Sequence, residues 1–272
     1  MRRTWQETQL AFEQGWYEYE GRRVDLSADL DDMRRGTLLY LPGELRRLPF
    51  AEGMGQTRVE VTAESTLEAV ERLAGAGNGA GAGRVAVLNF ASARNPGGGV
   101  ARGARAQEES LARSSALYDA LIRCPEFYEF HRDNPDPFYS DQVIYAPDVP
   151  VFRRDDGSWL PAPLRAAFLT SAAPNRRMIE RDRPGAAGKI PGALSSRARG
   201  VLAVAAHHRN SHLVLGAWGC GVFGNDPAEV AEAFAVHLRG DFAGVFEQVV
   251  FAILDVDDAT RESFEWALTD TS

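Results

Sequence analysis

Two adjacent carboxylates are the residues of this sequence best suited to catalysis. Glu108 and Glu109 follow Gln107 at the start of an expected helix, and residues 100–106 separate them from the triple glycine 97–99. A carboxyl group in such a pair can give a proton to a leaving oxygen and later take one from water. A glycine loop that seats a phosphorylated ribose beside the pair would suit cleavage of a glycosidic or ribosyl bond.

The same carboxylates have a structural interpretation. Acidic residues are common in the first turn of a helix because they stabilise the helix dipole. That dipole lowers the pKa of a carboxyl group, whereas a general acid must hold its proton near neutral pH. Burial, a neighbouring carboxylate and a bound diphosphate would each raise the pKa. Successive helical residues point about 100° apart, so we expect only one of Glu108 and Glu109 to face the scissile bond.

The first glycine loop covers residues 89–100 and follows an apolar strand. Its consecutive glycines, Gly97, Gly98 and Gly99, permit positive φ angles and can bring main-chain N–H groups close to a ligand. A flexible connection between a strand and a helix is the alternative interpretation. The position favours binding, because ligands of open α/β sheets lie at the carboxyl ends of the strands.

The second glycine loop covers residues 216–225 and follows another apolar strand. It leads into a helix with Asp226 at the N-cap, Pro227 at the first position and Glu229 completing a capping box. The N–H groups and dipole of this helix start favour an anion in the loop. The sequence therefore predicts that phosphate is held by main-chain amides and not by a lysine cluster.

Hydrophobic periodicity gives the elements that must position these loops. Strands are expected at 37–40, 58–61, 85–90, 143–147, 167–172, 213–216 and 249–254. Helices are expected at 4–20, 66–74, 106–122, 192–206 and 227–238, with Cys124-Pro125 ending the third of them. We expect 74–83 to be a surface loop and 127–141 to be a polar segment with prolines. Apolar strands between helices indicate a sheet covered on both faces, and so an α/β fold.

Composition limits the possible functions. The 272 residues are 44% hydrophobic and 25% charged, which is typical of a packed globular protein. The sequence has no apolar run long enough to cross a membrane, and its first residues lack the apolar core of a secretory signal. Two cysteines suit a reducing cytoplasm. A formal net charge of -8 argues against a basic groove for DNA or RNA.

Other kinds of site are not supported. Neither loop fits the dinucleotide fingerprint, and the phosphate loop that ends in Gly-Lys-Ser/Thr is absent. Cys220 is expected to be a small packed residue, because a nucleophile elbow would need glycine where Trp218 stands. His207, His208 and His212 lack the spacing of metal ligands and are expected at a helix end or the surface. We therefore expect no metal ion and no cofactor.

Together, the triple glycine 97–99, the spacer 100–106 and Gln107-Glu108-Glu109 resemble the poly(ADP-ribose) glycohydrolase signature G-G-G-x(6–8)-Q-E-E. Residues 93–96, 170–175 and 219–225 are similar to the compact bacterial-type branch of that family, and the likeness extends from about residue 37 to the last strand. It implies a macrodomain-like three-layer αβα fold with a central mixed sheet and an N-terminal helical extension. We expect one catalytic domain over residues 1–272, with the extension over about 1–35.

The resemblance also implies roles for residues. Glu109 would protonate the leaving oxygen of the ribose–ribose bond and then deprotonate the water that attacks an oxocarbenium-like ribose. Glu108 would orient the terminal ribose, with support from Gln107. Asn95 would contact that ribose, and Phe223 would pack beside it. The other expected substrate-binding positions are Gly97, Gly98, Gly99 and Val100 in the first loop and Gly219, Cys220, Gly221, Val222, Gly224 and Asn225 in the second.

The implied partners are poly(ADP-ribose), the product ADP-ribose and poly-ADP-ribosylated proteins, with the protein acting as a cytoplasmic monomer in reversal of ADP-ribosylation and in the DNA damage response. Two alternatives stay open. One is a non-catalytic macrodomain that binds ADP-ribose; the other is a macrodomain hydrolase that removes single ADP-ribose groups or deacetylates the acetyl ester. Because a net charge of -8 disfavours tracking along a polyanion, we expect cleavage at chain ends.

Overall fold

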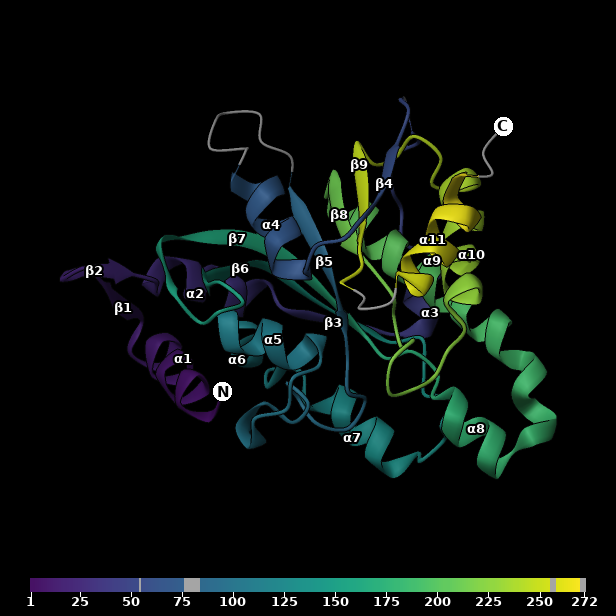
Figure 1. Ribbon diagram of the computed structural model, residues 1–272, viewed down its shortest axis with the longest axis horizontal. Helices are drawn as coiled ribbons and strands as arrows, with labels where there is room; N and C mark the ends of the chain where they lie inside the picture. Colours follow the sequence, from purple (N-terminus) through teal and green to yellow (C-terminus); the bar gives the residue numbers. More distant parts are fainter. Residues whose placement is uncertain (54, 76–83, 255–257, 270–272) are drawn as a thin grey trace.

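A single mixed sheet runs through the centre of the molecule in the computed structural model, which describes residues 1–53, 55–75, 84–254 and 258–269 (Figure 1). The sheet has seven strands. In spatial order they are β3 (Leu38–Tyr40), β6 (Val143–Arg153), β7 (Trp159–Ser171), β5 (Val85–Phe90), β8 (His212–Leu215), β9 (Gln248–Ala252) and β4 (Arg58–Thr62).

Strand direction determines where a ligand can bind. Strands β7, β5, β8, β9 and β4 run parallel to one another, and β6 is antiparallel to both of its neighbours. The carboxyl ends of the five parallel strands therefore lie at one edge. The expected α/β class and mixed sheet are confirmed, and the loops that follow β5 and β8 leave the sheet side by side.

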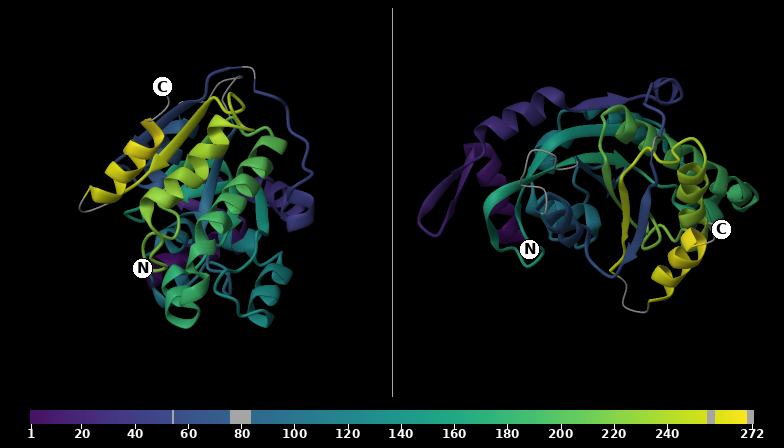
Figure 2. Two further views of the ribbon diagram at one scale, coloured as in Figure 1. Left: turned by 90° about the vertical axis from the view of Figure 1, so that its right-hand side faces the viewer. Right: turned by 90° about the horizontal axis from the view of Figure 1, so that it is seen from above.

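Helices cover both faces of the sheet, which gives the three layers seen in Figure 2. Strand β5 shows the pattern, because Ala86 and Leu88 join one core cluster while Val85 and Val87 join the other. The first cluster is covered by α3 (Pro42–Leu45), α9 (Ile190–His207), α10 (Pro227–Arg239) and α11 (Ala259–Thr269). The second is covered by α1 (Arg2–Gln14), α2 (Ser27–Gly36), α4 (Thr66–Gly75), α5 (Gln107–Ser114), α6 (Leu117–Leu121) and α7 (Pro125–Asp133).

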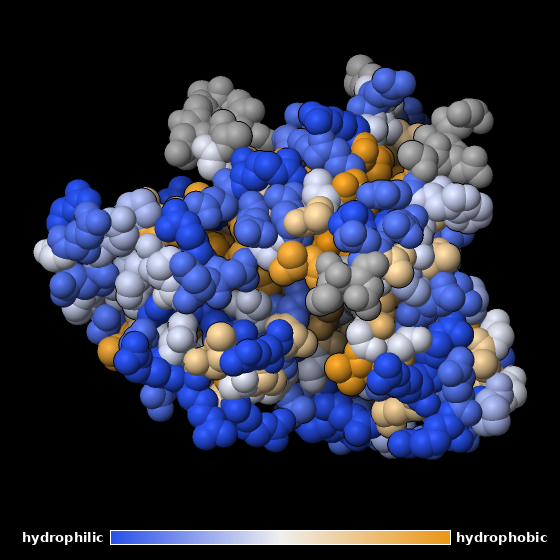
Figure 3. All heavy atoms as spheres, in the orientation of Figure 1, coloured by the Kyte–Doolittle hydropathy of each residue, from blue (hydrophilic) through white to orange (hydrophobic). Residues whose placement is uncertain are grey.

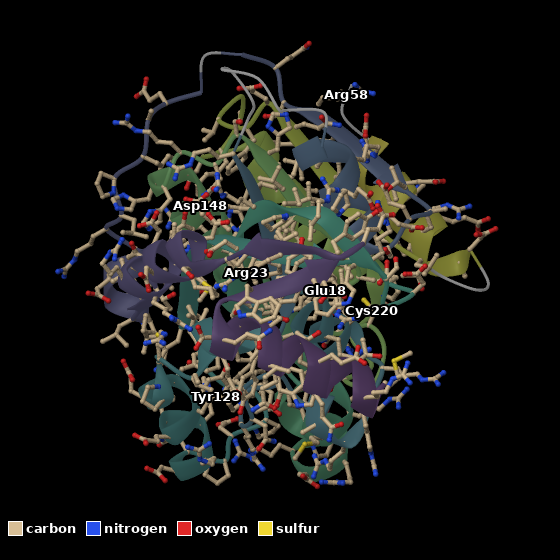
Figure 4. All side chains as sticks on the ribbon, turned by 90° about the vertical axis from the view of Figure 1, so that its left-hand side faces the viewer. Glu18, Arg23, Arg58, Tyr128, Asp148 and Cys220 are labelled. Atoms are coloured by element: carbon tan, nitrogen blue, oxygen red, sulfur yellow. The ribbon has the colours of Figure 1, made fainter. Side chains whose placement is uncertain are left out.

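The N-terminal extension is only partly helical. The expected helix 4–20 ends at Gln14, where Gly15 adopts a left-handed conformation with φ 79°. The chain then forms a two-stranded hairpin from β1 (Trp16–Tyr19) and β2 (Arg22–Asp25), on which Glu18 and Arg23 are labelled in Figure 4. The guanidinium of Arg23 lies 4.9 Å from the centre of the Trp16 ring. The expectation of helix beyond Gln14 was therefore wrong.

The expected helix 106–122 is divided. Ser115 is extended and forms a bridge with Val151, and its hydroxyl donates to Leu111 O over 2.7 Å. This contact with β6 replaces the helical hydrogen bonds at that position and separates α5 from α6. Helix α6 ends at Leu121, before Cys124-Pro125 as expected. Pro125 also begins α7, where the missing N–H of proline carries no penalty. Part of the expected polar segment 127–141 is therefore helical.

Most of the remaining elements agree with those expected from the sequence, and some were not expected. Strands β3, β4, β5, β8 and β9 and helices α4, α9 and α10 lie within a few residues of their expected positions, while β6 and β7 extend further than expected. The short elements η1 (Val100–Arg102), α8 (Arg176–Asp182) and η2 (Pro184–Lys189) were not expected. Residues 76–83 of the expected loop 74–83 lie outside the described residues. No described helix is both long enough and apolar enough to span a membrane.

Candidate active site

Gln107 attaches the first turn of α5 to the end of β5. Its Oε1 accepts from the N–H of Phe90 over 2.9 Å, and its Nε2 donates to Leu88 O over 2.8 Å and to Thr66 Oγ1 over 3.3 Å. The Gln107 side-chain amide thus provides hydrogen-bond partners for main-chain groups at the end of β5. This arrangement fixes the position of the two carboxylates that follow.

Glu108 is buried, with 3% of its surface exposed. Its Oε1 accepts from Asn89 Nδ2 over 3.3 Å, and its Oε2 accepts from the N–H of Ser92 over 2.7 Å. Burial raises the pKa of Glu108 to about 8, although the Ser92 and Asn89 hydrogen bonds oppose the shift and the helix start favours the charged form. Burial thus opposes the helix dipole at Glu108 and favours its protonated form.

Glu109 has one oxygen held by the protein and one available. Its Oε1 accepts from the N–H of Gly99 over 2.8 Å. Its Oε2 is buried and has no hydrogen-bond partner among the described residues. A buried carboxyl oxygen without a partner is costly, and such a group in a folded protein is a candidate for contact with a ligand.

The narrow space between the two carboxylates requires glycine at position 98. Gly98 has φ 58°, and a Cβ there would overlap Glu109 Oε1 and come within 3.1 Å of Glu108 Oε2. Gly97 has φ 65°, and its Cβ would lie 3.0 Å from the ring of Tyr118. Both carboxylates therefore close around the main chain at Gly98, and no larger residue fits at that position without displacing them.

Several N–H groups of the first loop bind the protein's own carboxylates, and others bind neighbouring main-chain and side-chain oxygens. Besides the Ser92 and Gly99 contacts, the main-chain amide of Gly97 interacts with Glu108, and Gly98 N donates to Asn95 O over 3.0 Å. The expectation that these amides face a ligand therefore does not match the structure. The side chain of Asn95 is exposed at the start of this turn.

The second loop is closed by Asn225, which is 2% exposed. Its main-chain N–H donates to Gly219 O over 3.1 Å, and its Nδ2 donates to Pro174 O over 2.9 Å. Gly219 and Gly224 have φ 73° and 70°. Asn225 thus shapes the loop from within and does not project from it.

The tip of the second loop offers free hydrogen-bond donors. Among the residues that the structure describes, the N–H groups of Gly221, Val222 and Phe223 donate to no protein acceptor. The Val222 side chain is 76% exposed, and the half-buried Phe223 ring lies 6.1 Å from that of Tyr139. Three consecutive free amides are suited to binding an anion.

The start of α10, the helix after this loop, has the expected N-cap but not the expected capping box. Asp226 caps α10 by accepting from the N–H groups of Ala228, over 2.8 Å, and Glu229, over 3.3 Å. The expected capping box is not formed by Glu229, whose carboxylate pairs with Arg176 instead.

A depression joins the two loops. A cavity of about 500 Å³ is lined by residues that include Thr66, Phe90, Gln107, Cys220 and Leu254. A smaller cavity of about 130 Å³ shares Phe90 and Gln107 with it and extends to Phe223. Apolar atoms gather in the hollow at the centre of the face drawn in Figure 3, among largely hydrophilic residues. The carboxyl edge of the sheet therefore offers an elongated, partly apolar groove.

The residues considered as metal ligands lie elsewhere. No group of three or more His, Cys, Asp or Glu within the described ranges could hold a metal ion. His208 stacks on Tyr145 at 3.7 Å, and burial lowers its pKa to about 4. His207 contacts Pro49 O, and His212 contacts Ser211 Oγ, near the opposite edge of the sheet where β8 begins.

Comparison with known proteins relates this geometry to a family. The family model for the microbial-type PARG catalytic domain matches residues 5–154. The structure is similar to poly(ADP-ribose) glycohydrolase from Thermomonospora curvata, with 49% identity, 98% of each chain covered and a TM-score of 0.91. The chain belongs to the microbial-type PARG family. Among the curated proteins no match was found.

Two further structures of microbial PARG show ligands. The Thermomonospora curvata glycohydrolase bound to the inhibitor ADP-HPD matches with 49% identity over 97% of this chain and 98% of that one, at a TM-score of 0.89. The Deinococcus radiodurans glycohydrolase in complex with ADP-ribose matches with 42% identity over 89% and 98%, at a TM-score of 0.81. The expected fold and family are thus confirmed, and the protein is a PARG-type glycohydrolase.

Two residues near the PARG carboxylates were not expected from the sequence. Asn89 lies in β5 with no exposed surface and also donates to Thr170 Oγ1 over 3.2 Å. Its only sequence signal was an amide within an otherwise apolar strand. Tyr128 in α7 has a buried hydroxyl with no described partner, and burial together with the nearby Glu108 raises its pKa. Nothing in the sequence pattern distinguishes Tyr128 from a core residue.

Proposed function

We propose that Glu109 performs the acid–base chemistry of this poly(ADP-ribose) glycohydrolase, which hydrolyses ribose–ribose O-glycosidic bonds and releases ADP-ribose. The observation that carries the proposal is the unpartnered, buried Oε2 of Glu109 beside Gly98. Its other oxygen is fixed by Gly99, so the carboxyl group has one orientation and one free oxygen. A general acid needs both, because proton transfer requires hydrogen-bond contact with the reacting oxygen.

The reaction follows from this single free oxygen. Protonated Glu109 gives its proton to the leaving oxygen as the bond from that oxygen to the anomeric carbon breaks, and the bonding electrons leave with the oxygen. The ribose becomes oxocarbenium-like. A water then attacks the anomeric carbon and gives its proton to Glu109, which restores the acid for the next cycle.

Glu108 serves as the neutral partner of Glu109. Two ionised carboxylates so close together would repel each other and an anionic substrate. Because burial raises the pKa of Glu108 to about 8, the pair carries at most one negative charge at neutral pH. The protonated group can orient a hydroxyl of the terminal ribose, and Gln107 holds both carboxyls in place through β5.

The second loop supplies the diphosphate site. Free N–H groups at Gly221, Val222 and Phe223 and the start of α10 favour an anion at this point. The Phe223 ring then packs beside the terminal ribose, and Asn95 contacts its hydroxyls. The cavity of about 500 Å³ beside Phe90 and Gln107 is large enough for the adenosine part.

The whole chain acts as one catalytic domain, with α1, β1, β2 and α2 as its extension. The polymer, ADP-ribose and poly-ADP-ribosylated proteins are the partners, and the protein works as a monomer. The continuous sheet supports the single domain, and the family supports ADP-ribose as a ligand. The monomeric state and the protein partners stay predictions from the sequence. A cytoplasmic location and a part in the DNA damage response stay predictions from the sequence.

The test is incubation of the protein with purified poly(ADP-ribose) and chromatographic measurement of free ADP-ribose. We expect ADP-ribose to accumulate and the polymer to shorten. A parallel reaction uses a protein that carries single ADP-ribose groups. Release from that substrate alone would favour a mono-ADP-ribose hydrolase, and binding without release from either would favour a non-catalytic macrodomain.

A further inference from the structure

The segment between the triple glycine and α5 carries exposed positive charge. Arg102 and Arg105 lie in this segment, and both are exposed. Among the described residues neither forms an ion pair, whereas most arginines elsewhere pair with a carboxylate, as Arg34, Arg153 and Arg197 do. An arginine left unpaired in a protein of net charge -8 is available to an external anion.

The surroundings increase this local charge. Residues 92–106 contain no Asp or Glu. Arg2 Nε donates to Arg102 O over 3.2 Å, which brings a further guanidinium to the segment. Arg113, below it, donates to the main-chain oxygen of Ala104. The segment is thus a small basic surface, and its main-chain oxygens accept hydrogen bonds from Arg2 and Arg113.

Gly99 connects this basic surface to the catalytic carboxylate. Its N–H donates to Glu109 Oε1, and its carbonyl accepts from the N–H groups of Arg102, over 2.9 Å, and Ala104, over 3.2 Å. The leaving oxygen must lie against Glu109. The polymer unit attached to that oxygen must therefore begin within reach of residues 100–106.

We propose that Arg102 and Arg105 bind the diphosphate of the ADP-ribose unit on the leaving side of the scissile bond. The inference rests on the proposed function, because it takes Glu109 as the group at the leaving oxygen. The guanidinium group suits this ligand through its two-pronged geometry with phosphate oxygens. This subsite distinguishes a polymer from a single ADP-ribose group, and it gives an acidic protein a local attraction for a polyanion.

The test compares two substrates on one variant. Poly(ADP-ribose) has a second diphosphate, whereas 4-nitrophenyl ADP-ribose has an uncharged leaving group on the same anomeric carbon. For Arg102→Ala/Arg105→Ala we expect kcat/KM on the polymer to fall about tenfold or more, the loss typical of charge-assisted contacts. On the nitrophenyl substrate kcat/KM of Arg102→Ala stays within about twofold of the unmodified protein. Arg105 also lines the cavity of about 500 Å³ assigned to the adenosine part, so its removal affects both substrates. The salt dependence of the polymer reaction becomes shallower, because fewer phosphates are contacted.

Two controls separate a local site from general effects. Arg22→Ala/Arg47→Ala removes the same charge from exposed, unpaired arginines of β2 and of the turn after α3, and is expected to change neither reaction. Arg102→Ala alone should reproduce part of the polymer effect, because Arg102 does not line the large cavity.

The outcomes distinguish this inference from the proposed function. Equal losses of Arg102→Ala on both substrates, or the same polymer loss in the control variant, would overturn the second subsite. Unchanged polymer kinetics in the double variant, with melting temperatures that show a folded protein, would also overturn it. If the unmodified protein hydrolyses neither substrate, the proposed function itself fails.

Discussion

The main-chain N–H of Gly99 donates to Glu109 Oε1 over 2.8 Å. In the same loop the N–H of Ser92 donates to Glu108 over 2.7 Å. The first glycine loop thus acts as a cradle for the two carboxylates of the protein, and the free amides for a ligand diphosphate are in the second loop. We therefore assign catalysis to the loop after β5 and anion binding to the loop after β8, at the same edge of the sheet.

The first prediction concerns Glu109→Ala. The variant removes the carboxyl group to which we assign proton donation, so we expect release of ADP-ribose from the polymer to be lost almost completely, by about 10²-fold or more. ADP-ribose binding should remain, because the second loop is unchanged. Product release by chromatography and ADP-ribose binding by calorimetry measure the two effects separately.

Glu109→Gln is the matched control for this variant, since it keeps the shape of the side chain and cannot act as an acid. It should be as inactive as Glu109→Ala while binding ADP-ribose. Near-normal turnover in either variant would show that the mechanism is assigned to the wrong residue.

The second prediction concerns Gly98→Val. A side chain at this position would overlap Glu109 Oε1 and would have to adopt φ 58°, which β-branched residues strongly disfavour. We expect turnover to be lost because both carboxylates are displaced, and affinity for ADP-ribose to fall because Glu108, to which we assign the contact with the terminal ribose, is displaced. Calorimetric titration measures the affinity, and Gly43→Ala, in open space on α3, is the control. Unchanged binding by Gly98→Val would contradict the need for a bare main chain here.

The third prediction concerns pH and Glu108. Its pKa is raised by burial to about 8 from a reference value of 4.5, so the folded protein binds one proton more than the unfolded chain between these values. The free energy of unfolding therefore falls as pH rises from about 5 to 8, by up to about 1.4 kcal/mol per pH unit from this group. Denaturant titrations at several pH values measure this slope.

Glu108→Gln tests the source of that slope. The amide keeps the size of the protonated acid, and the unpartnered Oδ1 of Asn89 can accept from it after the Asn89 amide turns over. The variant should lose most of the decline in stability between pH 5 and 8 and be more stable than the unmodified protein at pH 8. An unaltered slope would mean that other groups cause the pH dependence.

The fourth prediction concerns Asn225→Ala. It removes the hydrogen bond to Pro174 O that closes the second loop, and we expect a loss of about 1–2 kcal/mol in the free energy of unfolding. Affinity for ADP-ribose should fall further than in Asn210→Ala, which removes a comparable buried contact to Ala205 O at the end of α9. Equal affinities in the two variants would rule out a special role for loop closure.

Much of this arrangement could be predicted from local patterns. The apolar strands at β5 and β8 and the helices that follow them were visible in the periodicity, and parallel strands place the following loops at one edge. The sequence alone could therefore predict that the carboxylate pair and the glycines lie close together. That the pKa of Glu108 is raised could not be predicted, because this depends on the burial of its side chain, which Ser92 and Asn89 contact.

Other features depend on contacts between distant residues. The break at Ser115 arises from its bridge to Val151, which overrides a helical pattern on both sides. Residues 16–20, which belong to the hairpin, were expected to be helical because aromatic side chains such as Trp16 and Tyr17 fit either period. The short α7 was missed because Pro125 was taken as an end and not as a beginning.

The arginines at Arg102 and Arg105 have a consequence for how activity can be regulated. Guanidinium groups keep their charge at any pH that the fold survives, and acetyltransferases modify lysine, of which this chain has only Lys189. The attraction for the polymer therefore cannot be switched off by alkalinity or by acetylation. A loss of polymer affinity between about pH 7 and 8 must therefore come from other groups, among which Glu108 has its pKa raised to about 8.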